Sequence, residues 1–205
     1  MLLFFLSLSL SFFNINFEIF RHHTSDITGL LYAHNGARLI SSDSEGNLCL
    51  FDANDNYRLQ RTVAKALSTG KKRFVTLSMS FDGKHTAYVG PTEYTVTIIE
   101  TNSLNQILKI DISSCSLIAN DRRLGTSNEA ALFAKFAPNK QLIVATTSLK
   151  LLKFDSSTGK LLNIINSVHK RSLDYLTFSS DSQYLITAGD NMLKFWDDIN
   201  FQVEI

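Results

Sequence analysis

Histidine and cysteine are the residue types in this 205-residue sequence that most readily bind metal ions or act as nucleophiles. No two of the five histidines have the helical spacing of a metal-binding pair, and Cys49 and Cys115 lie far apart along the chain. Two cysteines form no disulfide framework, which is typical of a reducing compartment. The sequence therefore predicts no metal site, and Cys49 is expected inside a buried strand. The histidines are His22, His23, His34, His85 and His169.

Phosphate binding is suggested by two copies of Ser-Thr-Gly-Lys, at residues 68–71 and 157–160. A phosphate-binding loop also needs an earlier glycine, but Lys65 and Phe154 occupy that position. The sequence contains no Gly-x-Ser-x-Gly nucleophile turn either. We therefore expect both tetrapeptides to be turns between strands, and we predict no catalytic residue, no cofactor and no enzyme activity.

Basic residues gather in three short clusters that could contact an acidic partner. The 20 basic and 19 acidic side chains leave a net charge of +1, which argues against a general nucleic-acid binder. The clusters are consistent either with solvated loops or with a surface for an acidic partner such as a microtubule. They are Lys71, Lys72 and Arg73, then Arg122 and Arg123, and then His169, Lys170 and Arg171.

Any such surface needs a fold that holds it in place. A repeated pair of residues, an apolar residue followed by an acid, which we call the mark, indicates what that fold is. An apolar residue followed by an acid ends four β-rich segments, and the four acids are separated by 48, 55 and 42 residues, where a β-propeller blade takes roughly 40–45. Each mark closes an apolar run and opens a short polar turn. The marks are Phe51-Asp52, Ile99-Glu100, Phe154-Asp155 and Trp196-Asp197.

Each repeat contains up to four β-rich runs separated by turns, of which Asn35-Gly36 and Asp82-Gly83 are strong hairpin signals. We therefore predict an all-β fold, with about four antiparallel four-stranded blades of a larger β-propeller. The connection at residues 113–129 departs most from regular spacing and is either a partner contact or a tolerated insertion. The expected blades cover about residues 14–63, 64–112, 128–166 and 167–205.

The fourth repeat resembles the WD-repeat family most closely. His169, Thr187, Asp190, Trp196 and Asp197 fall at the positions of the family motif. The resemblance implies a hydrogen-bond network that locks the loop between blades onto the third strand. Because buried polar groups must all be satisfied, the expected role of this network is rigidity.

The other repeats match the motif less well. In the first repeat, His23, Ser42, Glu45, Phe51 and Asp52 align with it, but phenylalanine lacks the indole donor. The second and third repeats keep the strands and lose the polar lock. Their aligned residues are Gly90, Glu93 and Ile99 in the second repeat, and Ala145, Ser148 and Phe154 in the third.

Residues 87–97 and 104–111 resemble the POC sixteen-type centriolar branch of the WD-repeat family, with Gly90-Pro91 as the most distinctive element. This resemblance extends from about Phe17 to the end. It implies a cytoplasmic protein at the centriole or ciliary base, with protein partners that include centriolar or microtubule components. Nucleic acid and membrane are not expected partners.

The first 13 residues are apolar or serine throughout, and no basic residue occurs before Arg21. The segment is short for a membrane span, and it lacks the basic start and small-residue cleavage site of a secretory signal. A signal or anchor, a strand of a preceding blade and a false translation start all remain open.

Three functions are compatible with the sequence. The leading hypothesis is a non-catalytic scaffold for protein–protein interaction in centriole or cilium assembly, because rigid blades can present variable loops. The alternative is a WD-repeat adaptor of another complex, such as a ubiquitin ligase substrate receptor. An enzyme or secreted propeller would need converging acids or metal ligands, and no motif supplies them.

Overall fold

In the residues that this computed structural model describes, sixteen strands form four separate four-stranded antiparallel sheets, which we number blades 1 to 4 in chain order. The apolar segment 1–13 and the basic clusters 71–73 and 122–123 lie outside the residues that the structure describes. Those residues are 21–33, 35–69, 77–113, 115 and 130–197, with the backbone of 203–204.

Consecutive strands pair in each blade, so every blade is a simple meander. Blade 1 comprises β1 (Ile27–Tyr32), β2 (Arg38–Asp43), β3 (Leu48–Asp52) and β4 (Arg58–Val63). Blade 2 comprises β5 (Ser78–Met79), β6 (His85–Val89), β7 (Thr95–Glu100) and β8 (Gln106–Asp111). Blade 3 comprises β9 (Ala131–Phe136), β10 (Gln141–Thr146), β11 (Leu151–Asp155) and β12 (Leu161–Ile165). Blade 4 comprises β13 (Tyr175–Phe178), β14 (Tyr184–Gly189), β15 (Met192–Asp197) and β16 (Val203–Glu204).

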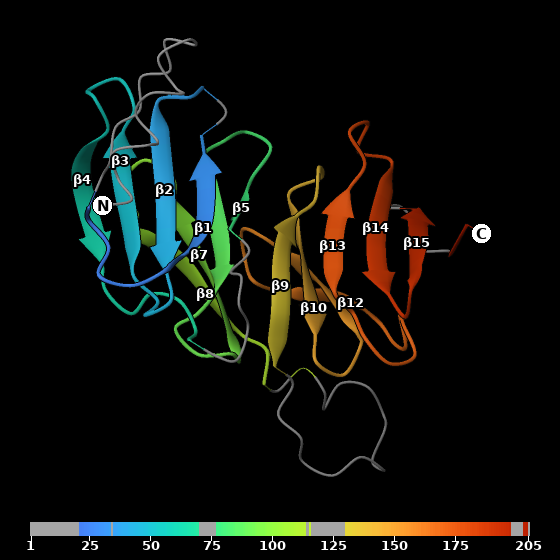
Figure 1. Ribbon diagram of the computed structural model, residues 1–205. Helices are drawn as coiled ribbons and strands as arrows, with labels where there is room; N and C mark the ends of the chain where they lie inside the picture. Colours follow the sequence, from blue (N-terminus) through green and yellow to red (C-terminus); the bar gives the residue numbers. More distant parts are fainter. Residues whose placement is uncertain are drawn as a thin grey trace, which may run out of the picture.

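The sheets follow one another along an arc, with blade 1 at the left and blade 4 at the right of Figure 1. This arrangement confirms the all-β fold class and the antiparallel four-stranded blades. Cys49 lies in β3 and is buried, as the sequence predicts. Within the described residues, no helix has the length and apolar character needed to cross a membrane.

A serine–aspartate pair builds the turn between the first two strands of blades 2 and 4. The Ser80 hydroxyl donates a hydrogen bond of 2.6 Å to Asp82 and accepts one from the backbone N–H of His85. Ser179 and Asp181 repeat these contacts in blade 4. Such local side-chain bonds favour a turn at these positions through residues close along the chain.

The hydrophobic core lies at the junctions between blades rather than inside any one sheet. One buried cluster joins blades 1 and 2 and includes Ile40 and Ile99. A second joins blades 2 and 3 and contains Ile98 and the fully buried Phe154, and a third joins blades 3 and 4. Each blade therefore depends on its neighbours for its core.

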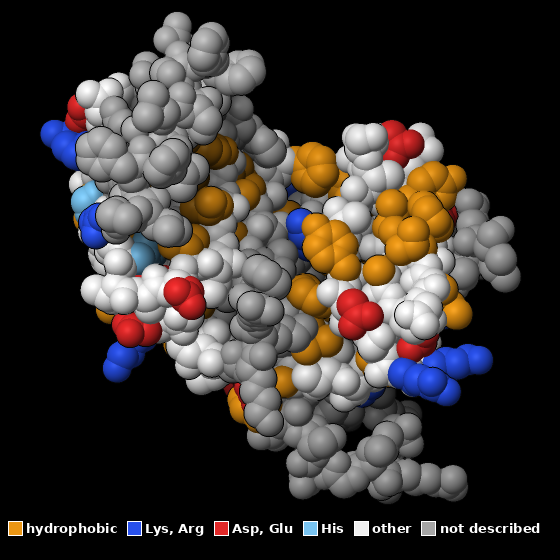
Figure 2. All heavy atoms as spheres, viewed as in Figure 1, with side chains coloured by type: hydrophobic (Ala, Val, Ile, Leu, Met, Phe, Trp, Pro, Cys, Tyr) orange, Lys and Arg blue, Asp and Glu red, His pale blue; other side chains and the backbone are white. Residues whose placement is uncertain are grey.

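The two end blades expose large apolar side chains. Leu193 on β15 is 62% exposed and Leu30 on β1 is 65% exposed, and Figure 2 shows hydrophobic side chains gathered over blade 4. Apolar sheet faces of this kind are covered by neighbouring blades in a closed propeller. These faces are consistent with four blades of a larger propeller.

Two glycines allow the segments between blades to pass close to a neighbouring strand. A Cβ atom at Gly90 would lie 2.2 Å from the Ala66 carbonyl oxygen. At Gly189 it would lie 2.1 Å from the Ser172 carbonyl oxygen and 2.9 Å from the His169 ring. Both contacts are far shorter than van der Waals distance, so any side chain at these positions would push the blade junction apart.

We expect Gly90→Ala and Gly189→Ala each to lower the free energy of unfolding by about 3 kcal/mol, because the added methyl group meets backbone atoms. Urea unfolding of the chain measures this effect. Gly36→Ala is the matched control, since its Cβ would have no neighbour within 4 Å. There the positive φ should cost only about 1 kcal/mol. Equal losses at the three positions would contradict the close-approach explanation.

Candidate functional site: the polar networks and the groove between blades 2 and 3

Thr187 is the centre of a buried hydrogen-bond network in blade 4. The Trp196 indole N–H donates to its hydroxyl oxygen over 3.0 Å, and Nε2 of His169 lies 2.9 Å from the same oxygen. The two strand residues come from β14 and β15, whereas His169 belongs to the segment between blades 3 and 4. The network therefore ties that segment to two strands.

Asp190 holds the same segment through its backbone. Its carboxylate accepts hydrogen bonds from the backbone N–H groups of Lys170, Arg171 (2.8 Å) and Ser172 (3.0 Å), which keep the pKa of Asp190 low. The nearest approach to the His169 ring, at Nδ1, is 3.8 Å and too long for a hydrogen bond. Asp190 thus anchors the loop directly rather than through the histidine.

Burial lowers the pKa of His169, and the nearby Lys194 ammonium lowers it further. The Lys194 ammonium donates to the Val168 carbonyl oxygen over 2.6 Å and lies 5.8 Å from the Trp196 ring centroid. The neutral imidazole is therefore the favoured form of His169, and its hydrogen bond to Thr187 links the segment between blades 3 and 4 to β14. Asp197 ends β15, opposite Tyr184 of β14.

Blade 1 contains a second network, built from different residues than the sequence alignment indicates. His23 contacts Asp43 through Nδ1 at 2.8 Å and Ser41 through Nε2 at 2.5 Å. The structure therefore places Ser41 and Asp43 where the alignment predicts Ser42 and Glu45. Because adjacent residues of a strand face opposite sides, the Ser42 hydroxyl contacts Thr28 instead, at 3.2 Å.

Unequal hairpin lengths explain this difference. In blade 4, Trp196 pairs with Leu185, and Thr187 lies two residues further along β14. In the other blades, the position that corresponds to Thr187 is likewise two residues beyond the one that pairs with the apolar residue of the mark. The connections between the second and third strands of these blades are longer than in blade 4. If the spacing between Thr187 and Trp196 is used to count back from the mark in the other blades, the residue found lies one position too far along the strand in blades 1 and 3. In blade 2 it lies two positions too far. The corresponding residues are Ser41, Tyr88 and Val144, in place of Ser42, Gly90 and Ala145.

Two acids of the repeated mark, Asp52 and Asp155, stabilise the ends of their strands through ion pairs and hydrogen bonds. Asp52 forms an ion pair with Arg38 at 2.7 Å, accepts a hydrogen bond from Gln60 and lies outside the His23 network. Asp155 accepts bonds from the hydroxyl and backbone groups of Ser157 and Thr158, which lower its pKa to about 2. Residues 157–160 therefore lie in the turn between β11 and β12, as the sequence predicts.

The basic loops that the sequence proposes as partner contacts are only partly visible. Lys71, Lys72, Arg73, Arg122 and Arg123 lie outside the described residues, so their role stays a prediction. Lys170 and Arg171 are exposed beside the buried His169, and Asp190 holds their backbone.

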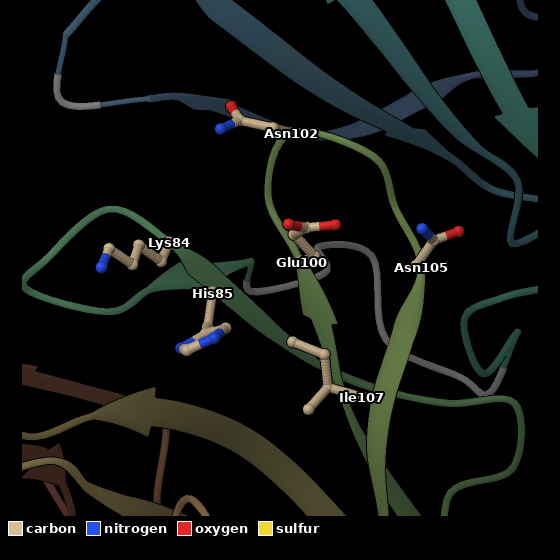
Figure 3. Close-up of a pocket in the computed structure, with 6 residues that line it drawn as sticks. All are labelled: Lys84, His85, Glu100, Asn102, Asn105 and Ile107. Atoms are coloured by element: carbon tan, nitrogen blue, oxygen red, sulfur yellow. The ribbon is translucent and has the colours of Figure 1, made fainter.

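A groove between blades 2 and 3 is a concave feature that the sequence does not predict. Two cavities of about 600 and 510 Å³ share His85 and Ile107, where the strands of these blades turn. Figure 3 shows that both side chains project into the same space, with Asn102 and Asn105 on the neighbouring hairpin. Apolar residues placed beside turns in the sequence are the signal that could have indicated this groove. In the part of the chain that the structure describes, no three His, Cys, Asp or Glu side chains gather as a metal site requires.

A family model described as the second β-propeller of WDR90/POC16 matches residues 7–205 of the chain. The chain belongs to this family. Its WD repeats explain the strand pattern and the two His-centred networks. Members of the family are also among the similar curated proteins.

WD repeat-containing protein 90 of Xenopus tropicalis is 35% identical over 181 residues, which cover 86% of this chain and 10% of that protein. Its human counterpart is 30% identical over 179 residues, covering 85% and 10%. Centriole proteome protein 16 of Chlamydomonas reinhardtii is 25% identical over 183 residues, covering 85% and 8%. The chain thus spans about a tenth of the length of these relatives.

Among solved structures, that of U3-55K superimposes with a TM-score of 0.68 at 16% identity. The match covers 91% of this chain and 53% of that chain. The crystal structure of the RRP9 WD40 repeats gives the same TM-score at 16% identity, covering 91% and 52%. At this identity the similarity shows the shared propeller fold.

We expect Thr187→Val to lower the free energy of unfolding by about 2 kcal/mol, because it leaves the buried Trp196 N–H without its acceptor. Thermal and urea unfolding of the chain test this. Thr187→Ser is the control, since it keeps the hydroxyl and should lose less stability. If serine and valine destabilise equally, the hydroxyl is not what holds the network.

The low pKa of Asp155 predicts a pH-dependent contribution to stability. Its folded pKa, about 2, lies below the ordinary value of 3.8, so the ionised carboxylate stabilises the turn above about pH 4. This contribution is lost as the pH falls towards 2. The Tm difference between the wild-type chain and Asp155→Asn should therefore shrink over that range, as measured by circular dichroism. A difference that stays constant with pH would contradict the assignment.

Proposed function

We propose that this chain is a non-catalytic scaffold segment that mediates protein–protein interaction in centriole or cilium assembly. The observation that carries the proposal is the use of its reactive side chains. His169 and Thr187 in blade 4, and His23 and Ser41 in blade 1, hydrogen-bond to partners within the blade junctions. Residues of the types that catalyse reactions elsewhere thus hold the propeller rigid, which suits a platform for partners.

The centriolar setting is supported by the relatives. The family is named for WDR90/POC16, and the Chlamydomonas relative is named centriole proteome protein 16. We infer a cytoplasmic protein concentrated at the centriole or ciliary base, with centriolar or microtubule-associated proteins as partners. In this proposal the basic loop residues Lys71, Lys72 and Arg73 face an acidic partner surface.

Localisation of the full-length protein tests this function. A tagged version should concentrate at centrioles, together with a centriole marker, in dividing and ciliated cells. The same protein carrying Lys71→Ala, Lys72→Ala and Arg73→Ala should be less enriched there, and circular dichroism of the substituted protein checks that it is still folded. A diffuse cytosolic distribution of the unsubstituted protein would overturn the centriolar role and favour an adaptor of another complex.

A further inference from the structure

Lys135 places an amine at the junction between blades 3 and 4. It lies on β9, the first strand of blade 3, which runs beside β13 of blade 4 and contacts it (Figure 1). Side chains two residues apart on a strand share a face. At that spacing Lys135 is flanked by Phe133 and Ala137, and both belong to the buried cluster that joins the two blades. The stem of this partly buried lysine therefore lies over an apolar junction.

No acid compensates the charge of Lys135 in the part of the chain that the structure describes. Its side chain forms no ion pair or hydrogen bond there. The acids that flank β13, Asp174 and Asp181, accept hydrogen bonds within their own turns from Ser172 and Ser179. A partly desolvated charge without a partner is costly. Burial accordingly lowers the pKa of Lys135, and no charged neighbour opposes that shift.

Two other lysines near this junction keep their charge in more favourable surroundings. The Lys194 ammonium donates to the Val168 carbonyl oxygen over 2.6 Å and lies 5.8 Å from the Trp196 ring centroid. Lys170 is exposed, so water solvates its ammonium. Of the three lysines, Lys135 therefore gains least from holding its proton.

The chemistry that follows is that of a nucleophilic amine, because a lysine attacks carbonyl carbon only in its neutral form and apolar surroundings favour that form. With an acyl thioester, the lysine nitrogen attacks the carbonyl carbon. The N–C bond forms, the C–S bond breaks, and the thiol leaves with a proton from the nitrogen. The product is an uncharged amide, so the reaction removes the uncompensated charge from the blade junction.

We propose that Lys135 is an acylation site for small acyl thioesters and that the acylated chain is the more stable form. Its partial exposure allows a small acyl group to reach the end of the long side chain. The apolar junction around the stem favours the neutral product. This modification goes beyond the scaffold function and does not depend on it.

Competitive acetylation of the full chain tests the site. The folded chain is exposed briefly to acetyl-CoA at a series of pH values, and mass spectrometry of the digested chain measures the acetyl group on each lysine. The rate at Lys135 should reach half of its maximum at a lower pH than the rate at Lys170. At neutral pH, Lys135 should react several-fold faster than Lys194, the matched control from the same junction.

Neutral substitutions test whether loss of the charge stabilises the chain. Lys135→Met keeps an unbranched side chain and removes the charge, so it should raise Tm by about 3 °C. Lys170→Met is the control and should leave Tm unchanged, since its ammonium is already solvated. Circular dichroism measures both transitions.

Three results would overturn the proposal. They are an absence of acetyl group on Lys135 when Lys170 is acetylated, a half-maximal pH for Lys135 that is not below that of Lys170, and a Tm of Lys135→Met that does not exceed that of the wild type. None of them affects the localisation test of the centriolar role, because that test does not involve Lys135.

Discussion

Packing of one blade against the next is the interaction on which this structure depends. The buried residues form three clusters, and each cluster draws its side chains from two neighbouring sheets. Ile98 and Ile99, adjacent on β7, show this directly, because Ile98 packs towards blade 3 and Ile99 towards blade 1. A strand whose two faces are both buried needs a partner on each side, which explains the nearly continuous apolar runs of the central strands.

The segments that join the blades must stay fixed for this packing to hold, and the chain achieves this in two ways. Blades 1 and 4 use polar networks centred on His23 and His169. In blade 2 the buried Tyr88 occupies the position of Thr187 and packs in one cluster with Ala66 and Leu67. A buried aromatic ring thus occupies the position of the threonine in the blade 4 network, and burial raises the pKa of the Tyr88 phenol.

This architecture also explains where binding surfaces can form. The Thr187 hydroxyl and both ring nitrogens of His23 are engaged within the blade junctions, so we expect binding specificity to come from the turns at the ends of the strands. Two turns of neighbouring blades diverge around His85 and Pro138 and leave the groove between them.

Local features of this fold follow from the sequence because they depend on residues close along the chain. The Ser80–Asp82 and Asp155–Ser157 turns and the four-fold mark are of this kind, and hydrogen bonds join His169, Thr187 and Trp196, three residues that the family motif picks out. Only the tertiary structure shows that Ser41, rather than Ser42, contacts His23. The longer hairpin of blade 1 changes which residue of β2 faces the histidine without changing the repeat in the sequence. The groove required it as well, since its walls come from two blades that only packing brings together.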